Sequence, residues 1–380
     1  SNLPPPVETA MTIKKTILLG LLMLPLTFVW AEDNIAADPE RMEQRIKALS
    51  EHGANADGGV DRVAFSEADI AGRAYVMELM KGAGLDTSVD TAGNIIGRRE
   101  GSEADLPPIL FGSHIDSVPG GGNYDGDVGV IGAIEVVELL EASNIRTRHP
   151  LEVVVFSDEE GGLTGSRAMV GRIDDDTLSV MSHSGMTIGE GIRALGGDPD
   201  RLDLARREPG EIKAFIELHI EQGAILDEED IDIGVVEGIV GIRWWDVTIE
   251  GFANHAGTTP MNRRWDAMVT AAEYILEVNR VATSMPGTQV ATVGRIHAAP
   301  GAPNVIPGEV VLSLEIRDLS AEKMQRVFDE IRAAGERIAE ARSTPIRYEE
   351  IAVDVAPAPT DERLRRIIAT SADNLGLSNR

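Results

Sequence analysis

Apolar and polar residues recur along this chain with two different periods, which predict helices and strands. Apolar residues have helical spacing in residues 39–50 and 67–84, and the second stretch ends at a glycine. Residues 128–143 are a third predicted helix, because the stretch is long and has an apolar face. Runs rich in Ile, Leu, Val and Phe that end in polar residues predict strands at 107–114, 151–160 and 214–223.

The order of strand, helix and strand predicts an α/β domain with a mostly parallel sheet flanked by helices. Open parallel sheets bind ligands beyond the carboxyl ends of their strands. The three predicted strands end at His114, at the run Asp158 to Glu160, and at His219. We therefore expect histidine and carboxylate side chains from three separate segments to gather at one edge of the sheet.

The pattern changes from about Val240 onward. Residues 242–251 alternate like a half-exposed strand. Further strands are predicted at 288–300 and 309–319, and helices at 266–284 and 321–342. This order predicts an inserted α+β open-faced sandwich; its role as a lid or dimerisation domain is implied only by the resemblance to known enzymes given below. The predicted division is a leader at 1–31, a catalytic domain at 32–238 and 345–380, and the inserted domain at 239–344.

Length, charge and cysteine content narrow the function classes. The chain has 380 residues, more than one hydrophobic core usually supports, which agrees with two domains. It carries 63 acidic and 35 basic residues and a net charge of −28, so nucleic acid and anionic membranes would be repelled. We expect no nucleic-acid partner. Because the chain has no cysteine, only His, Asp and Glu could bind a metal ion.

Residues 11–31 have the layout of a cleavable secretory signal. Lys14 and Lys15 precede the apolar run 16–30, and Val29-Trp30-Ala31 has small residues at its first and third positions. We expect a mature chain that starts near Glu32 and is periplasmic or secreted. The run is shorter than the roughly 20 residues of a membrane span, so no stable span is expected after cleavage. A retained membrane anchor is the alternative, and residues 1–10 have the character of a tag remnant.

The polar residues after the predicted strands supply the components of a two-metal site. His114 and His219 are candidate imidazole ligands, and Asp125 in the bend NYDGD can bridge two ions through its two oxygens. Glu159 and Glu160 would point in opposite directions in an extended backbone, so one could bind a metal ion while the other faces a substrate.

Asp116 lies two residues after His114, on the same side of a strand. We expect its carboxylate to hold the second ring nitrogen of that histidine. Taken alone, each of these residues has an ordinary interpretation: a surface histidine, an Asp-Gly turn, or a solvated pair of glutamates. Their occurrence at three strand ends favours the metal site.

These motifs together resemble a known group of enzymes. His-x-Asp, Asp-Gly, Asp-Glu-Glu-Gly and Glu-Leu-His-Ile-Glu-Gln-Gly, in this order, are similar to the dinuclear zinc aminoacylase/carboxypeptidase superfamily. HIEQG at 219–223, NHAGTTPM at 254–261, NVIPGEV at 304–310 and EIRDL at 315–319 resemble its hydantoinase/carbamoylase-type amidases. That branch contains N-carbamoyl-L-amino acid hydrolases, β-ureidopropionases and allantoate amidohydrolases. The resemblance extends from about residue 40 to the C-terminus.

The resemblance implies two divalent metal ions and a role for each catalytic residue. His114, Asp125 and His219 match the ligands of the first ion, and Asp125 and Glu160 match those of the second. Glu159 matches the general base that activates the water between the ions. Zinc is the first choice of metal, with manganese, cobalt or nickel as alternatives.

The resemblance also implies substrate-binding residues and a homodimer formed through the inserted domain. Gln222, Asn304 and Arg317 match substrate-contacting residues, the last two of which grip the substrate carboxylate. His255 matches a residue that stabilises the developing oxyanion in the site of the partner subunit. A structural salt bridge is the alternative for Arg317, and a turn histidine is the alternative for His255.

The implied reaction is hydrolysis of the carbamoyl C–N bond of an N-carbamoyl-L-amino acid, or of an allantoate-type ureido substrate. An exported metallo-aminopeptidase or carboxypeptidase of the same superfamily is an alternative, although HIEQG and Arg317 argue against it. The last metal ligand in the family is a histidine in a Ser-Gly-Ala-Gly-His-Asp stretch that would follow Arg380. We expect the second ion to lack this ligand here because the chain is truncated, and an inactive binding protein is the remaining alternative.

Overall fold

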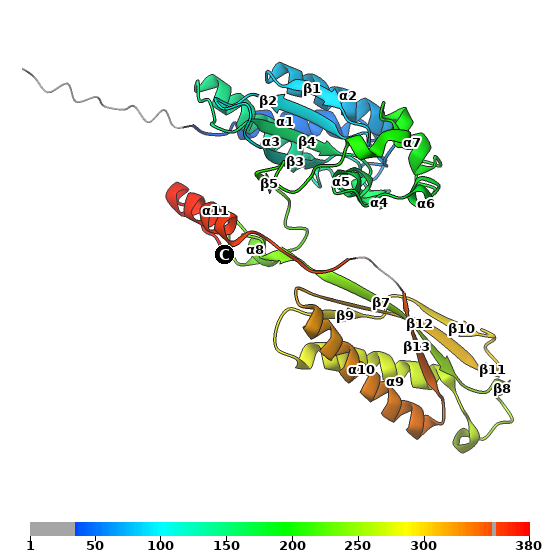
Figure 1. Cartoon of the computed structure of the whole chain (residues 1–380). Helices are drawn as coiled ribbons and strands as arrows, with labels where there is room; N and C mark the ends of the chain where they lie inside the picture. The colour runs from blue at the N-terminus through cyan, green and yellow to red at the C-terminus, as the bar shows by residue number, and fades with distance from the viewer. Residues whose placement is uncertain (1–34, 352–354) are drawn as a thin grey trace, which may run out of the picture. The chain divides into compact units, whose positions relative to one another are not determined.

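The computed structural model describes residues 35–351 and 355–380 and has two compact units (Figure 1). The first unit ends at Ile220 and the second begins at Glu221. The predicted signal at residues 11–31 lies outside the described residues. Within the described part of the chain, no helix is both long enough and apolar enough to cross a membrane.

The first unit is an α/β unit built around a five-stranded sheet. Its strands are β1 (Asp86–Val89), β2 (Ile95–Arg99), β3 (Ile109–His114), β4 (Leu151–Phe156) and β5 (Ala214–Ile216). Its helices are α1 (Pro39–Ser50), α2 (Glu67–Gly82), α3 (Asp127–Ala142), α4 (Glu159–Gly162), α5 (Thr164–Met169), α6 (Asp175–Leu178), α7 (Ile188–Ala194) and the 3-10 helix η1 (Pro199–Leu204).

The strand order is β1-β2-β4-β3-β5, and β3 runs parallel to both β4 and β5. The predicted parallel arrangement is therefore confirmed for the three strands that carry the candidate site. The sheet as a whole is mixed, because β1 and β2 are antiparallel and β2 joins β4 antiparallel. Only residues 90–94 separate β1 from β2, which is too short for a crossover, whereas α3 connects β3 to β4.

Helices cover both faces of this sheet, because successive residues of a strand point to opposite sides. Val153 and Val155 of β4 are buried in one core with residues of α1, α2 and α3. Val154 is buried on the other face, in a cluster that includes Met169 of α5. The carboxyl ends of β3 and β4 therefore lie at the same edge of a well-packed sheet. His114 is the last residue of β3, and the Asp158–Glu160 segment follows β4.

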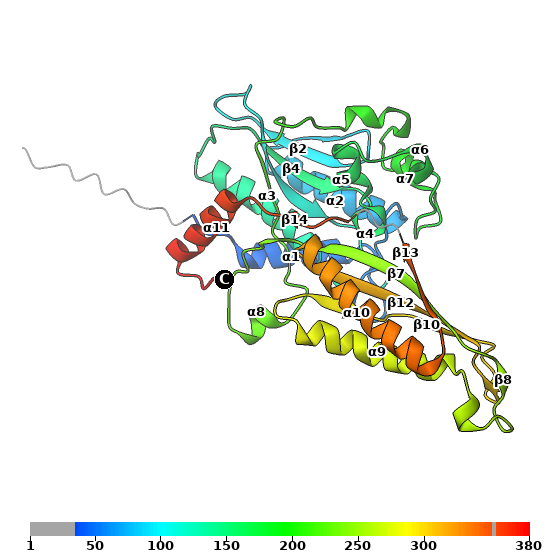
Figure 2. The ribbon, with the colours of Figure 1, turned by 60° about the horizontal axis from the view of Figure 1, so that its bottom comes forward.

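The second unit contains a second sheet, two long helices and several short elements (Figure 2). Its strands are β6 (Gly238–Ile239), β7 (Gly241–Glu250), β8 (Asn254–His255), β9 (Val290–Thr292), β10 (Ile296–Ala299), β11 (Val305–Ile306), β12 (Glu309–Asp318), β13 (Ile346–Ile351) and β14 (Ala358–Pro359). Its helices are α8 (Ile225–Glu228), η2 (Met261–Arg263), α9 (Ala267–Ser284), α10 (Ala321–Arg342) and α11 (Glu362–Leu375).

The predicted open-faced sandwich forms from β10, β12, β7 and β13, with β9 also paired to β12. Helices α9 and α10 pack together and share one apolar core with alternate residues of β7 and β12. Trp245 of β7 stacks on Phe328 of α10 with ring centroids 4.2 Å apart. This unit thus has one face of the sheet buried by helices, as the alternating pattern of residues 242–251 predicted.

The predicted end of the inserted domain at residue 344 is too early. β13 pairs with β7 in the second sheet, because Ile346 and Tyr348 pack against the apolar core of that unit. Further along, β14 pairs with β6, and Ile233 bridges to Asn379. The described strands after residue 344 therefore pair within the second unit, and none of them joins the first sheet.

Candidate metal centre

His114 is the last residue of β3, and its side chain is held in one orientation. The residue is 3% exposed, and its Nδ1 lies 2.9 Å from the main-chain oxygen of Asp116. The carboxylate of Asp116 lies farther away, with Oδ1 3.8 Å from the same nitrogen. Asp116 therefore holds the second ring nitrogen through its main-chain carbonyl and not through its carboxylate, because the chain bends after β3. A carbonyl accepts only, so Nδ1 carries a proton, and Nε2 is the ring nitrogen that faces the nearby carboxylates.

The Asp116 carboxylate instead supports the next strand end. It accepts hydrogen bonds from the main-chain N–H groups of Glu159 at 3.2 Å and Glu160 at 3.1 Å. These two residues open the short helix α4, after Asp158 takes a left-handed conformation with φ 49°. The expected extended backbone at Glu159 and Glu160 is therefore wrong. A buried carboxylate satisfies the free N–H groups of the first helical turn, which favours helix over strand at this point.

Asp125 lies between two histidines that come from distant segments. His219 Nε2 is 3.2 Å from Asp125 Oδ1, and His114 Nε2 is 3.9 Å from the same oxygen. The Nδ1 of His219 lies 2.7 Å from the main-chain oxygen of Ile220. Ligand atoms of His114, Asp125 and His219 all lie within 4.8 Å of one another. The predicted first set of ligands is thus brought together within the first unit.

The donor set of this cluster fits a divalent cation. Both histidines donate Nδ1–H to a main-chain carbonyl and therefore point Nε2, the ring nitrogen left for a metal ion, toward the shared carboxylate. Two neutral imidazoles and one carboxylate form a nitrogen and oxygen donor set that suits zinc and other first-row transition metals.

The carboxylates around this cluster are electrostatically coupled. Burial is the main cause that raises the pKa of Glu159 to about 7, with His114 opposing it and Asp116, Glu160 and Glu217 adding to it. The pKa of Glu160 is also raised, again first by burial. Glu159 Oε2 lies 3.7 Å from His114 Nε2, so the predicted base borders the predicted ligands. A cation in the cluster would favour the ionised carboxylates and lower these pKa values.

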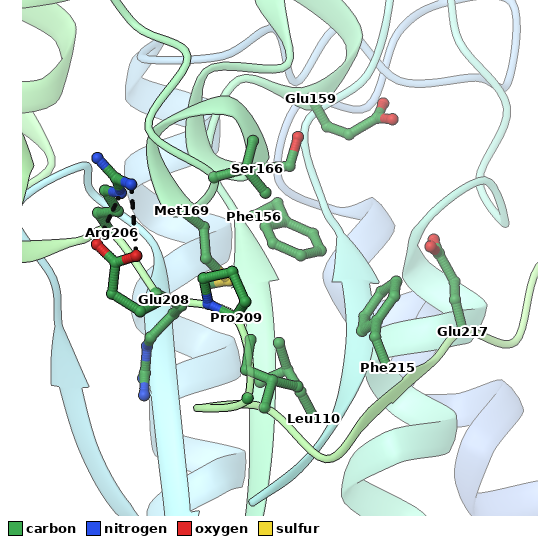
Figure 3. Close-up of a pocket in the computed structure, with 14 residues that line it drawn as sticks. Leu110, Phe156, Glu159, Ser166, Met169, Arg206, Glu208, Pro209, Phe215 and Glu217 are labelled. Carbon is green, nitrogen blue, oxygen red and sulfur yellow. Dashed lines mark hydrogen bonds and ion pairs between the residues drawn. The ribbon is translucent and has the colours of Figure 1, made fainter. Parts of the chain in front are cut away.

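Glu159 also lines an apolar pocket of about 620 Å³ (Figure 3). Glu159 and Glu217 are polar members of its lining, while Phe156 and Phe215 contribute rings with centroids 5.7 Å apart. Sequence reasoning missed Glu217, which accepts a hydrogen bond from Ser113 Oγ at 2.5 Å. The signal was present, because Phe215, Glu217 and His219 alternate and so share one side of an extended segment.

The second unit brings two of the predicted substrate-binding residues together. β8 pairs with β11, which places His255 opposite Val305, and Ala256 N donates to Asn304 O at 3.0 Å. His255 Nδ1 accepts hydrogen bonds from the N–H groups of Gly257 at 3.0 Å and Thr258 at 3.2 Å. The Nδ1 of His255 is thus an acceptor. The Nδ1 atoms of His114 and His219 instead face carbonyl oxygens and donate.

Arg317 lies elsewhere on the same unit and is engaged within its own strand. Its Nε donates to Glu315 Oε1 at 2.7 Å, and Glu315 also accepts a hydrogen bond from Trp244. The salt bridge that was the alternative interpretation of Arg317 is thus present. Gln222 is exposed and has a left-handed conformation with φ 52° just after His219.

Comparison with known proteins identifies the family of this chain. Residues 110–379 match peptidase family M20/M25/M40. An N-carbamoyl-L-amino acid amidohydrolase of Geobacillus stearothermophilus is 41% identical over 342 residues, which cover 89% of this chain and 83% of that protein. The chain belongs to the M20/M25/M40 family.

Other relatives of this M20/M25/M40 chain are similar along most of its length. An allantoate amidohydrolase of Bacillus subtilis is 33% identical and covers 88% of this chain and 82% of its own. A crystal structure of a hydantoinase/carbamoylase family amidase from Burkholderia ambifaria has a TM-score of 0.85 at 32% identity, covering 91% of this chain and 85% of that one. The family match spans every residue from His114 to Arg317 that the sequence singled out.

Proposed function

We propose that this protein hydrolyses the carbamoyl or ureido C–N bond of an N-carbamoyl-L-amino acid, using divalent metal ions. The observation that carries the proposal is the convergence of the Nε2 atoms of His114 and His219 on the Asp125 carboxylate. The relatives that act on N-carbamoyl-L-amino acids and allantoate support this reaction over the peptidase alternative. One water is consumed, and the amino acid, carbon dioxide and ammonia are released.

Each residue of the candidate metal centre has its own role in the proposed hydrolysis. His114, Asp125 and His219 would hold one ion, and Asp125 and Glu160 would hold a second. A divalent cation supplies Lewis-acid polarisation of the carbonyl and lowers the pKa of water. Glu159, beside His114, is placed to accept a proton from the attacking water and return it to the departing nitrogen. Asp116 holds the backbone of Glu159 and Glu160, so both carboxylates start from a fixed turn.

We propose zinc as the native metal, with manganese, cobalt or nickel as alternatives, because the donor set contains both imidazoles and carboxylates. Metal analysis of protein purified without added metal tests this choice directly. A preparation that contains none of these metals, and gains none on incubation with them, would contradict the metal centre itself.

The Glu159→Gln variant tests the proposed chemistry. Gln has the same shape but cannot accept the proton, so ammonia release from N-carbamoyl amino acids should fall by at least about 100-fold while metal content stays unchanged. Glu208→Gln, on the wall of the same pocket away from the ligands, is the matched control and should keep full activity. Allantoate and dipeptides complete the substrate panel. Cleavage of dipeptides alone would favour the peptidase, and binding without turnover would favour an inactive binding protein.

The proposed homodimer is supported by distances within the second unit. Gly308 accepts a hydrogen bond from Gly251 close to the β8–β11 pair, and from there β12 continues away to Arg317, which lies opposite Ile242. The eight residue steps of strand from Glu309 to Arg317 span about 26 Å at the usual rise. One small substrate therefore cannot contact His255 and Arg317 of the same chain. Both residues can serve one site only if a second copy supplies one of them.

Mixing two inactive variants tests this arrangement. Glu159→Gln and His255→Ala homodimers should each be inactive, whereas exchange of subunits should restore about a quarter of the wild-type activity, because one site in each mixed dimer is intact. If mixing restores no activity although light scattering shows mixed dimers, His255 does not act across the dimer. A monomer that is fully active would contradict the dimer.

We also propose that the protein is exported, on the basis of the charged and apolar pattern of residues 11–31. Expression of the full chain in a bacterium, followed by fractionation and N-terminal sequencing, should find a mature protein outside the cytoplasm that begins near Glu32. Recovery of only the uncleaved chain in the cytoplasm would refute export.

A further inference from the structure

Arg62 is a fully buried arginine that no part of the proposed reaction uses. It lies in the segment between α1 and α2, and its side chain is 1% exposed. The guanidinium donates two hydrogen bonds to the carboxylate of Asp127, at 2.8 and 2.6 Å, and Asp127 is itself fully buried. A buried ion pair of this kind is costly to desolvate and is weak evidence for stability alone. Since stability alone does not explain this ion pair, its position next to the proposed metal ligands suggests a role at the metal centre.

The remaining donors of Arg62 reach the main chain around His114. Arg62 Nε donates to the carbonyl of Ile115, the residue directly after His114, at 2.6 Å. The backbone of Arg62 also exchanges hydrogen bonds with Ser117, through Arg62 N to Ser117 Oγ at 3.0 Å and Ser117 N to Arg62 O at 2.9 Å. The other terminal nitrogen donates to Leu49 O at 2.9 Å and His52 O at 3.1 Å, at the end of α1.

Asp127, the other half of the pair, is the first residue of α3 and follows Asp125 by two positions. Gly126 between them packs directly on the imidazole of His114, since a Cβ at this glycine would lie 2.6 Å from His114 Cε1. Arg62 thus connects the two backbone segments that carry ligands: the turn after His114 on one side and the turn from Asp125 into α3 on the other.

We propose that the Arg62–Asp127 pair is a positioning device for the metal centre, which sets the separation between the His114 imidazole and the Asp125 carboxylate. The inference rests on the proposed metal site. Removal of groups that hydrogen-bond to metal ligands and orient them usually lowers metal affinity by about 10- to 100-fold. A guanidinium can bridge a carboxylate and a carbonyl at once through its planar fork, which a lysine cannot do.

Cobalt(II) is a suitable probe, because its visible absorption reports ligand geometry independently of turnover. Asp127→Asn and Arg62→Lys should each weaken Co²⁺ binding by about 10- to 100-fold and alter the visible spectrum. The double variant Arg62→Met with Asp127→Leu removes both buried charges. It should fold, because replacing a buried ion pair by apolar side chains is often neutral for stability, and should still bind Co²⁺ weakly.

Glu135→Gln is the matched control, because Glu135 is a buried ion-pair partner on the same helix and pairs with Arg41 at 2.6 Å, two turns from Asp127. It should lower the melting temperature without changing Co²⁺ affinity or spectrum. The inference is overturned if Asp127→Asn and the double variant bind Co²⁺ with wild-type affinity and spectrum. In that case the metal centre and the proposed hydrolysis stand. If the wild-type protein itself does not bind Co²⁺, both the positioning role and the metal centre are refuted.

Discussion

Gly126 offers a direct test of the packing against the metal-facing histidine. The residue has φ +68°, and an added Cβ would lie 2.6 Å from His114 Cε1 and 2.7 Å from its Nδ1. Gly120 has the same φ of +68°, but a Cβ there would meet nothing within 4 Å. Substitution by alanine places a side chain at a positive φ in both cases, and only the change at Gly126 also displaces His114.

The expected magnitudes follow from these two contributions. Alanine in a left-handed conformation costs about 1–2 kcal/mol, which should be the whole loss for Gly120→Ala. Gly126→Ala should lose a further amount of about 1–3 kcal/mol, because the ring and the chain around it must move to remove the overlap. Since His114 is a proposed ligand, Gly126→Ala should also weaken Co²⁺ binding by at least about tenfold.

Urea unfolding of the metal-free proteins and Co²⁺ titration of the folded proteins measure these two effects separately. Gly120→Ala measures the cost of alanine at a positive φ in open surroundings, so a larger loss of stability in Gly126→Ala, together with weaker Co²⁺ binding, reports the contact with His114. Equal losses of stability together with wild-type Co²⁺ affinity in both variants would refute the close packing of Gly126 on His114 and its role in the metal centre.

Three further outcomes are expected. Asp116→Asn should lower kcat by at least about tenfold, because an amide has only one oxygen and cannot accept hydrogen bonds from the N–H groups of both Glu159 and Glu160 as the carboxylate does. Unchanged steady-state kinetics would show that these two hydrogen bonds do not support the activity. Removal of bound metal with a chelator should lower the free energy of unfolding by about 3 kcal/mol if metal was present at 100 times its Kd. Calorimetry detects this loss as a lower Tm. An unchanged Tm would argue against a tight metal site. Burial raises the pKa of Tyr348 to about 12, and burial also raises that of Tyr274, so the folded protein keeps these protons where the unfolded chain releases them near pH 10. Stability should therefore fall as pH rises from about 10 to 12, by about 3 kcal/mol for Tyr348, and absorbance at 295 nm should show both tyrosines ionising with unfolding rather than before it.

Local sequence determined most of the secondary structure of this protein. The predicted helix at 321–342 coincides with α10, and the predicted strand at 309–319 ends one residue beyond β12. These segments are long and strongly periodic, so burial of one face decides their structure. The order of strands and helices also determined which strands run parallel, because the crossover helix α3 connects β3 to β4.

The sequence also determined which residue types could meet at the centre, because strand ends of a parallel sheet meet at one edge. His114, Asp125 and His219 lie together in the structure for this reason. Pairs that depend on the path of a turn could not be derived in this way. Whether Asp116 offers its carbonyl or its carboxylate to His114 depends on how the chain bends after β3.

Tertiary structure alone decided the contacts between residues that are far apart in sequence. Arg62 and Asp127 are separated by 65 positions, and neither has a neighbour in sequence that indicates the other. The start of the helix at Glu159 depends on Asp116, which is 43 positions away in sequence. Its carboxylate accepts hydrogen bonds from main-chain N–H groups that would pair with a neighbouring strand if this segment were extended. The sequence thus determined the elements and the chemical groups, because those follow from local periodicity. The protonated nitrogen of each histidine and the support behind each ligand depend on long-range hydrogen bonds that exist only once the chain is packed.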